Sequence, residues 1–185
     1  RTLYVNMRDT FFDCPDRERA QWWGDTVLLM SESFYTYSPE NHALMRKAIR
    51  ELCDWASPDG SIHAPIPGCY KSELPAQMMA SVGRFGFLNY YMNTGDLETL
   101  EYVYEPVKKY LSLYSYERDG FLKERKVGWM WGDWGDNRDM RLIMAAWHCI
   151  ALDSVADMAR ILGKPDDEAK YRAAAARLKK AFNKY

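Results

Sequence analysis

The sequence predicts an all-α fold, a partial (α/α) toroid of about three helical hairpins. Two observations support this prediction. Six apolar or amphipathic stretches of helical length alternate with turn-forming residues and leave little room for strands. A weak repeat starts at residues 38, 95 and 163, and each period joins a longer apolar stretch to a more polar one. This period exceeds the roughly 34 residues of a tetratricopeptide hairpin and suits a ring of larger hairpins.

The first two helices are expected after an extended lead-in over residues 1–8. Residues 25–35 place apolar side chains on one helical stripe. A second helix begins with Ser38 as its cap and Pro39 as its first residue. Residues 57–70 hold three prolines and two glycines, so they predict a long loop.

The later helices follow the same alternation. Small residues between positions 81 and 86 of the third helix permit close packing against a neighbour. Pro106 should break or kink the fourth. The fifth is the longest and most hydrophobic, and the sixth is charged and alanine-rich. The expected ranges of these four helices are 72–93, 97–116, 138–162 and 166–183.

Composition limits the functional classes. With 185 residues, 48% of them hydrophobic, the chain can form one domain over residues 1–185 with a sizeable core. A net charge of −1 without lysine or arginine runs makes nucleic acid a poor partner. No apolar run approaches the roughly 20 residues of a membrane span. The four cysteines form no Cys-x-x-Cys pair and are expected to be free thiols. The histidines stand singly, which argues against a metal cluster, and no cofactor motif is present.

Residues 13–25 concentrate acids, arginines and indoles in a loop ahead of the first long helix. Aromatic faces pack on the apolar faces of sugars, and carboxylates bind sugar hydroxyls or donate a proton. The stretch therefore indicates a site for a polar, ring-shaped ligand. In the structural alternative, Asp25 is a helix cap, the charges are solvated and the indoles belong to the core. The side chains concerned are Asp13, Arg17, Glu18, Arg19, Trp22, Trp23 and Asp25.

A second irregular stretch, over residues 121–136, is also aromatic. Its centre reads Trp129-Met130-Trp131-Gly132-Asp133-Trp134-Gly135-Asp136. Either these indoles contact a ligand, or they close the end of the helix bundle. We expect this stretch and residues 13–25 to lie at the same end of the bundle.

Both stretches resemble segments of one enzyme family. Asp13-Cys14-Pro15, Arg17, Glu18-Arg19, Trp22 and Gly24-Asp25 resemble the signature of α-L-rhamnosidases with a six-hairpin catalytic domain. Trp131, Asp133 and Trp134 resemble, less specifically, a Gly-Asp-Trp segment of the same family. Strong residue identity is confined to residues 13–25, although the layout matches along nearly the whole chain.

The resemblance implies an inverting glycoside hydrolase that releases terminal L-rhamnose from a rhamnose-containing glycan or glycoside. It implies that Glu18 is the general acid, and it implies no cofactor or metal. The general base of the family is a glutamate on a later hairpin, and no residue of this chain matches it. The substrate-binding residues that the resemblance implies are Asp13, Arg17, Trp22, Asp25, Trp131, Asp133 and Trp134.

We therefore expect residues 1–185 to be the N-terminal half of a six-hairpin catalytic domain, inactive alone and able to form a homodimer through its open edges. Three alternatives stay open: another six-hairpin enzyme, such as a glucuronyl hydrolase, a glucoamylase-like enzyme or a lyase; a carbohydrate-binding half-barrel without activity; and a helical scaffold for protein partners. The chain begins at Arg1 without a signal peptide, so the compartment stays open, with a periplasmic or secreted parent protein as one option.

Overall fold

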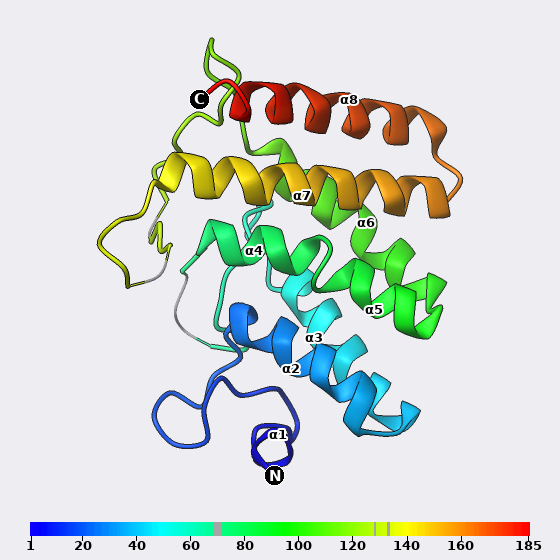
Figure 1. Cartoon of the computed structure of the whole chain (residues 1–185). Coiled ribbons are helices and arrows are strands. Elements are labelled where there is room, and N and C mark those ends of the chain that lie inside the picture. Colours follow the sequence, from blue (N-terminus) through cyan, green and yellow to red (C-terminus); the bar gives the residue numbers. More distant parts are fainter. Residues whose placement is uncertain (69–71, 128, 133) are drawn as a thin grey trace.

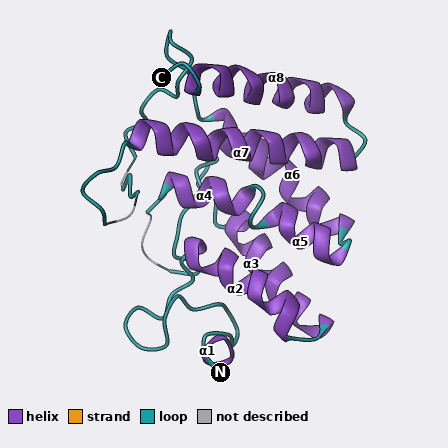
Figure 2. Cartoon of the chain, viewed as in Figure 1, coloured by secondary structure: helices purple, strands orange, loops and turns teal. Residues whose placement is uncertain are grey.

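The computed structural model describes residues 1–68, 72–127, 129–132 and 134–185, and this part of the chain is built from helices (Figures 1 and 2). It confirms the all-α partial toroid of three hairpins. Within the described ranges, β structure amounts to three isolated bridges. The helices are α1 (Thr2–Val5), α2 (Trp23–Thr36), α3 (His42–Asp54), α4 (Pro75–Val82), α5 (Phe87–Thr94), α6 (Leu97–Ser112), α7 (Met140–Ile161) and α8 (Pro165–Phe182), with a 3₁₀ turn η1 over Pro39–Asn41.

The helices form two layers. In the inner layer α2, α4 and α7 pack side by side in that order. The second layer contains α3 and α6, which contact each other, and α8 packs along α7. The N-termini of α2, α4 and α7 point to the same end, on the left of Figure 1. Segments that lead into the inner helices therefore reach this end, including residues 13–22, 129–132 and 134–139. The prediction that both aromatic stretches share one end is confirmed.

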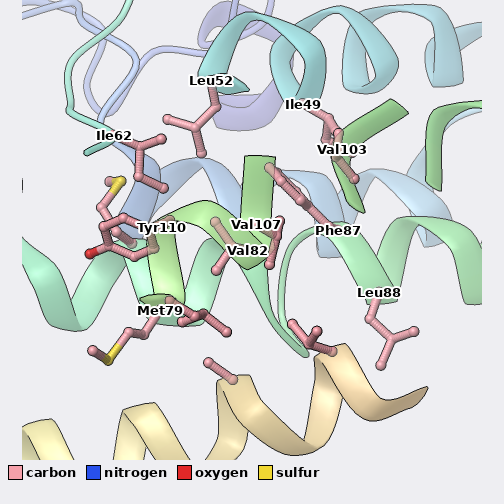
Figure 3. Close-up of a cluster of buried hydrophobic side chains, with 14 of the residues drawn as sticks. Ile49, Leu52, Ile62, Met79, Val82, Phe87, Leu88, Val103, Val107 and Tyr110 are labelled. Carbon is pink, nitrogen blue, oxygen red and sulfur yellow. The ribbon is translucent and has the colours of Figure 1, made fainter. Parts of the chain in front are cut away.

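The buried residues of the helices lie on the apolar faces that the sequence predicts. On α8, Tyr171, Ala175 and Leu178 recur at spacings of four and three and are buried, while the opposite face is charged. Between the layers, side chains of α3, α4, α5 and α6 interlock around Ile49, Leu52 and Phe87 (Figure 3). Truncating one of these large core side chains to alanine costs about 2–5 kcal/mol.

The single helix expected over residues 72–93 is instead two helices, α4 and α5, separated at Gly83–Gly86. At Gly86 an added Cβ would lie 2.0 Å from the carbonyl oxygen of Ser81. At Gly83 it would lie 3.2 Å from the Cα of Ala151 on α7. The small residues do permit close packing against α7, as expected, but they also break the helix.

Two further details of local structure differ from what the sequence predicts. Residues 1–8 are not extended, because Thr2–Val5 forms the short helix α1. Pro106 does not break the fourth helix, since α6 continues through it and ends at Ser112 rather than at residue 116. Proline lacks only one backbone donor, and the buried apolar side of α6 holds the helix in place around it.

One helix meets the length and composition expected of a membrane span. By length and composition α7 could cross a bilayer, but 56% of its most apolar window is buried within the bundle. Its apolar surface contacts α4 on one side and α8 on the other. These contacts account for its hydrophobicity as the core helix of the bundle.

Candidate active site

The loop over residues 13–22 is closed at its base by hydrogen bonds. Asp13 donates its N–H to the carbonyl of Ala20 at 2.9 Å, and Ala20 donates its N–H to Oδ1 of Asp13 at 3.0 Å. The buried side chain of Gln21 donates from Nε2 to the carbonyl of Ile66 at 2.9 Å. The base of the loop is thereby fixed to the neighbouring loop that leads into α4, and its tip remains in solvent.

Three side chains of this loop converge. One oxygen or sulfur atom each from Asp13, Cys14 and Glu18 lies within 4.8 Å of the others. Burial raises the pKa of Asp13, but hydrogen bonds from Glu18, from the Ala20 N–H and from Cys14 outweigh it and leave this pKa below its usual value. Asp13 and Glu18 therefore form a hydrogen-bonded carboxyl pair. A carboxylic acid held beside a carboxylate has the chemistry of a general acid.

The two arginines around Glu18 point in different directions. Arg17 places a guanidinium nitrogen 2.7 Å from Oε1 of Glu18, and its own side chain is 83% exposed. Arg19, in the left-handed backbone region at φ 47°, lies over the ring of Phe12 at 5.4 Å from its centre. The Asp13–Cys14–Glu18 group has the spacing of metal ligands, but the positive charge of Arg17 at Glu18 opposes a cation there.

Asp25 lies in the first turn of α2, where Trp22 and not Asp25 is the capping residue. Desolvation raises the pKa of Asp25 most, and the negative charge of Asp13 raises it further. A backbone hydrogen bond lowers this pKa, and the negative charge of Glu18 adds a small rise. The charge of the preceding loop therefore influences the pKa of Asp25. The interpretation of Asp25 as a simple helix cap is wrong.

A cavity of about 480 Å³ opens between the N-terminal parts of the three inner helices. It brings together the end of the first stretch, at Gly24 and Asp25, and part of the second, at Trp131 and Gly132. The cavity is mostly apolar, with few polar groups, as is usual for sites that bind small molecules. Its other lining residues are Val27, Leu28, Ala76, Gln77, Ala80, Phe85, Ile143 and Trp147.

None of these other lining residues was predicted as a site residue from the sequence, and three of them make informative contacts. Gln77 accepts the N–H of Gly24 at 3.3 Å, and a Cβ at that glycine would displace the Gln77 amide group. Phe85 and Trp147 contact each other edge to face, with ring centres 5.6 Å apart. Of the three, Gln77 has a local signal in the sequence, because Pro75 marks the start of a helix and places Gln77 in its first turn.

The indoles of the second stretch form a cluster. The ring centres of Trp129, Trp131 and Trp134 lie 6.0–6.3 Å apart in all three pairs. Trp134 is 77% exposed and Trp129 is 42% exposed, so the cluster does not simply plug the bundle. Asp133 lies outside the described residues.

Trp22 and Trp23 have different surroundings. Trp23 is fully buried and packs edge to face on Phe87, so the interpretation of this indole as core is correct. Trp22 is only half-buried, at the start of α2. Of the two, Trp22 is the one that a ligand at this end can reach.

A buried ion pair near the site was also missed. Glu73, just before α4, is 4% exposed and accepts two hydrogen bonds from Arg125, at 2.6 and 3.2 Å. The hydroxyls of Tyr110 and Tyr114 donate to the same carboxylate, each at 3.2 Å. This network joins the loop before α4 to the segment after α6, so it positions the end of the bundle that carries the cavity.

Solved structures of rhamnosidases are similar to this chain. A GH78 family rhamnosidase from Bacillus sp. GL1 is 20% identical, with a TM-score of 0.84, and the match covers 98% of this chain and 19% of that one. The enzyme from Dictyoglumus thermophilum is 24% identical, with a TM-score of 0.75, covering 97% and 20%. That from Streptomyces avermitilis, solved with L-rhamnose, is 21% identical, with a TM-score of 0.68, covering 98% and 18%. The chain thus shares their fold and spans about a fifth of their length.

No curated protein matches the chain. A profile of one family, described as the bacterial alpha-L-rhamnosidase 6 hairpin glycosidase domain, matches residues 1–185. The two-layer arrangement of hairpins, with the signature loop at the N-terminal end of its inner helices, agrees with that match. The chain therefore belongs to the bacterial α-L-rhamnosidase six-hairpin glycosidase domain family.

Proposed function

We propose that this chain forms the acid side of an inverting α-L-rhamnosidase site. One observation carries the proposal: the Asp13–Glu18 carboxyl pair belongs to the loop that leads into the cavity shared by Asp25 and Trp131. A proton donor, charged hydrogen-bond partners and aromatic faces are then available at one end of the fold. This combination suits a sugar with an apolar face and several hydroxyls.

In this proposal Glu18 donates its proton to the glycosidic oxygen while the bond from that oxygen to C1 of the sugar breaks. The aglycone leaves as an alcohol. A water molecule attacks C1 from the opposite face and gives its proton to a second carboxylate, and the product is free L-rhamnose with inverted configuration. One substrate water is consumed, and no redox partner takes part.

The remaining residues bind the sugar. Asp13 and Asp25 accept hydrogen bonds from its hydroxyls, and exposed Arg17 donates to them. Trp22, Trp131 and Trp134 provide faces for its C–H groups, and Asp133 is proposed as a further hydroxyl acceptor. The L-rhamnose in the Streptomyces avermitilis structure supports this choice of sugar.

The second carboxylate must come from elsewhere. Inverting enzymes hold their two carboxyl groups about 6.5–9.5 Å apart, so that a water fits between acid and base. Asp13 lies within 4.8 Å of Glu18, which is too close. We propose that residues 1–185 are the N-terminal half of the six-hairpin ring and that a later hairpin provides the base.

The test uses the complete protein and two rhamnosides, one with an activated aryl leaving group and one with an alkyl leaving group. Polarimetry or NMR then identifies the first-formed anomer of the product. Release of rhamnose with inversion is expected. Retention of configuration, or hydrolysis of other aryl glycosides in preference to the rhamnoside, would reject the proposal.

The close Asp13–Glu18 spacing favours one alternative for residues 1–185 by themselves, which is carbohydrate binding without hydrolysis. Large apolar side chains at the surface, such as Leu28 at 63% exposure and Met92 at 69%, would favour self-association of the isolated chain. Light scattering and a rhamnoside assay on the isolated chain test both points. A monomer that hydrolyses rhamnosides would show that a carboxylate within these residues serves as the base.

A further inference from the structure

Cys14 makes two contacts with Glu18. The backbone N–H of Glu18 donates to Sγ of Cys14 at 3.3 Å, and the thiol donates to Oε2 of the Glu18 side chain at 3.8 Å. Cys14 also hydrogen-bonds Asp13 and contributes to the lowered pKa of that carboxyl group. One sulfur atom therefore joins both members of the carboxyl pair.

We propose that Cys14 is a positioning residue for Glu18. By accepting the Glu18 N–H, its sulfur closes the turn from residue 14 to residue 18, which is otherwise exposed at the tip of the loop. By contacting Oε2, it limits the rotation of the carboxyl group and keeps it beside Asp13. This inference rests on the proposed function, because the orientation of Glu18 matters to a reaction only if Glu18 transfers a proton.

The chemistry of sulfur suits this role. A thiol is a weak hydrogen-bond donor and a weak acceptor. One guanidinium, that of Arg17, already lies 2.7 Å from Oε1 of Glu18. A thiol at Oε2 can orient the carboxyl group with less further stabilisation of its charged form than a second cationic group would bring. A strong donor in this place would stabilise the carboxylate, so Glu18 would already have lost the proton that a general acid must donate.

The other described cysteines have different surroundings. Cys53 is buried, and burial raises the pKa of its thiol far above the usual value. Cys149, on α7, donates to the carbonyl of Ala175 on α8 at 3.7 Å, away from the loop. Both therefore pack within the bundle. Cys149 provides a matched control, since it also makes a thiol hydrogen bond.

The experiment compares four forms of the complete protein: wild type, Cys14→Ala, Cys14→Ser and Cys149→Ala. Each is assayed on the alkyl and the activated aryl rhamnoside, and kcat and KM are determined separately. Misplacement of a catalytic group by about 1 Å can cost on the order of 100-fold in rate. We expect Cys14→Ala to lower kcat for the alkyl rhamnoside by roughly 10- to 100-fold, to lower it much less for the aryl rhamnoside, and to leave KM nearly unchanged.

Serine keeps a donor and an acceptor at the same position, so Cys14→Ser should restore much of the lost kcat, whereas Cys149→Ala should match wild type. Equal losses on both substrates without rescue by serine would show a merely structural role and overturn the inference. Wild-type kinetics in Cys14→Ala would overturn it as well.

A readout without activity separates this inference from the proposed function. Amide hydrogen exchange of peptides covering residues 14–20 should be faster in Cys14→Ala than in wild type and slower again in Cys14→Ser, because the Glu18 N–H loses and regains its acceptor. Unchanged exchange in Cys14→Ala would overturn the inference whatever the activity. A wild-type protein without rhamnosidase activity would reject the proposed function, and exchange would then decide alone whether sulfur closes the turn.

Discussion

Two glutamates near the same end of the molecule differ in burial, and this difference distinguishes a candidate catalytic carboxyl group from a structural one. Glu18 precedes the inner helix α2 and Glu73 precedes the inner helix α4. Each accepts a close contact from an arginine, at 2.7 Å from Arg17 and at 2.6 Å from Arg125. The side chains of the first pair are 83% exposed for arginine and 37% for glutamate, while those of the second are 18% and 5% exposed.

The difference lies in what else contacts each carboxyl group. Glu73 receives both Arg125 and two tyrosine hydroxyls, so its acceptors are saturated by the protein. Glu18 contacts an exposed arginine, a weakly interacting thiol and a neighbouring carboxylate, and it remains accessible to solvent. An ion pair alone therefore does not identify a catalytic group. Accessibility together with a second carboxylate is the more informative combination.

The largest expected effect is on activity. In the complete protein, Glu18→Gln should lower hydrolysis of the alkyl rhamnoside by about 10²- to 10⁴-fold, because positioned acid catalysis contributes that much. The activated aryl rhamnoside needs less protonation and should be affected less. The free energy of unfolding should change by no more than about 0.5 kcal/mol, as at other surface positions. Small, equal losses on both substrates would place Glu18 in the same structural class as Glu73.

Glu73 should show the opposite behaviour. Glu73→Gln leaves the guanidinium of Arg125 without its counter-charge in a mostly buried place, and breaking a buried ion pair in this way costs about 3–5 kcal/mol. Urea denaturation measures the loss. The double variant Glu73→Leu with Arg125→Met removes both charges and should recover part of it. The single variants Glu73→Leu and Arg125→Met are measured as well. If the double variant loses more free energy of unfolding than the two single variants lose together, the network does more than balance charge.

Sequence reasoning was most successful where the signal is local. Helical periodicity located α2, α3, α7 and α8 to within a few residues, because each buries a regular stripe against its neighbours. It missed the break between α4 and α5, since that break depends on how closely Gly83 approaches α7.

The residues of the candidate site also differ in whether a local sequence pattern reveals them. The signature loop could be recognised because its residue types are closely spaced along the chain. The pairing of Glu73 with Arg125 joins residues 52 positions apart and has no local pattern. The lining contributed by Phe85 and Trp147 likewise exists only after α4 and α7 have packed together.

A buried histidine, His148, should make the stability of the fold depend on pH. This residue on α7 is buried, with its ring 5.1 Å from that of Tyr114, and burial lowers its pKa to about 3. The unfolded chain binds the proton near pH 6.5, so stability should fall as pH decreases from about 6.5 towards 3, by roughly 3 kcal/mol between pH 7 and pH 4. Denaturation across this range, with His148→Gln as control, isolates the effect. The same pH slope in the control would assign the loss to other groups.

The smallest expected effect concerns the exposed pair of Arg17 and Glu18. Pairs of this kind contribute about 0–1 kcal/mol, because water screens both charges and holding two mobile side chains together costs entropy. Arg17→Ala should therefore change the free energy of unfolding by less than about 0.5 kcal/mol, and added salt should remove what remains. Arg125→Ala, measured in parallel, should cost several times more, because its partner Glu73 is buried. Comparable losses in the two variants would mean that Arg17 holds the signature loop together, and the contrast between an accessible and a structural glutamate would then no longer apply to this fold.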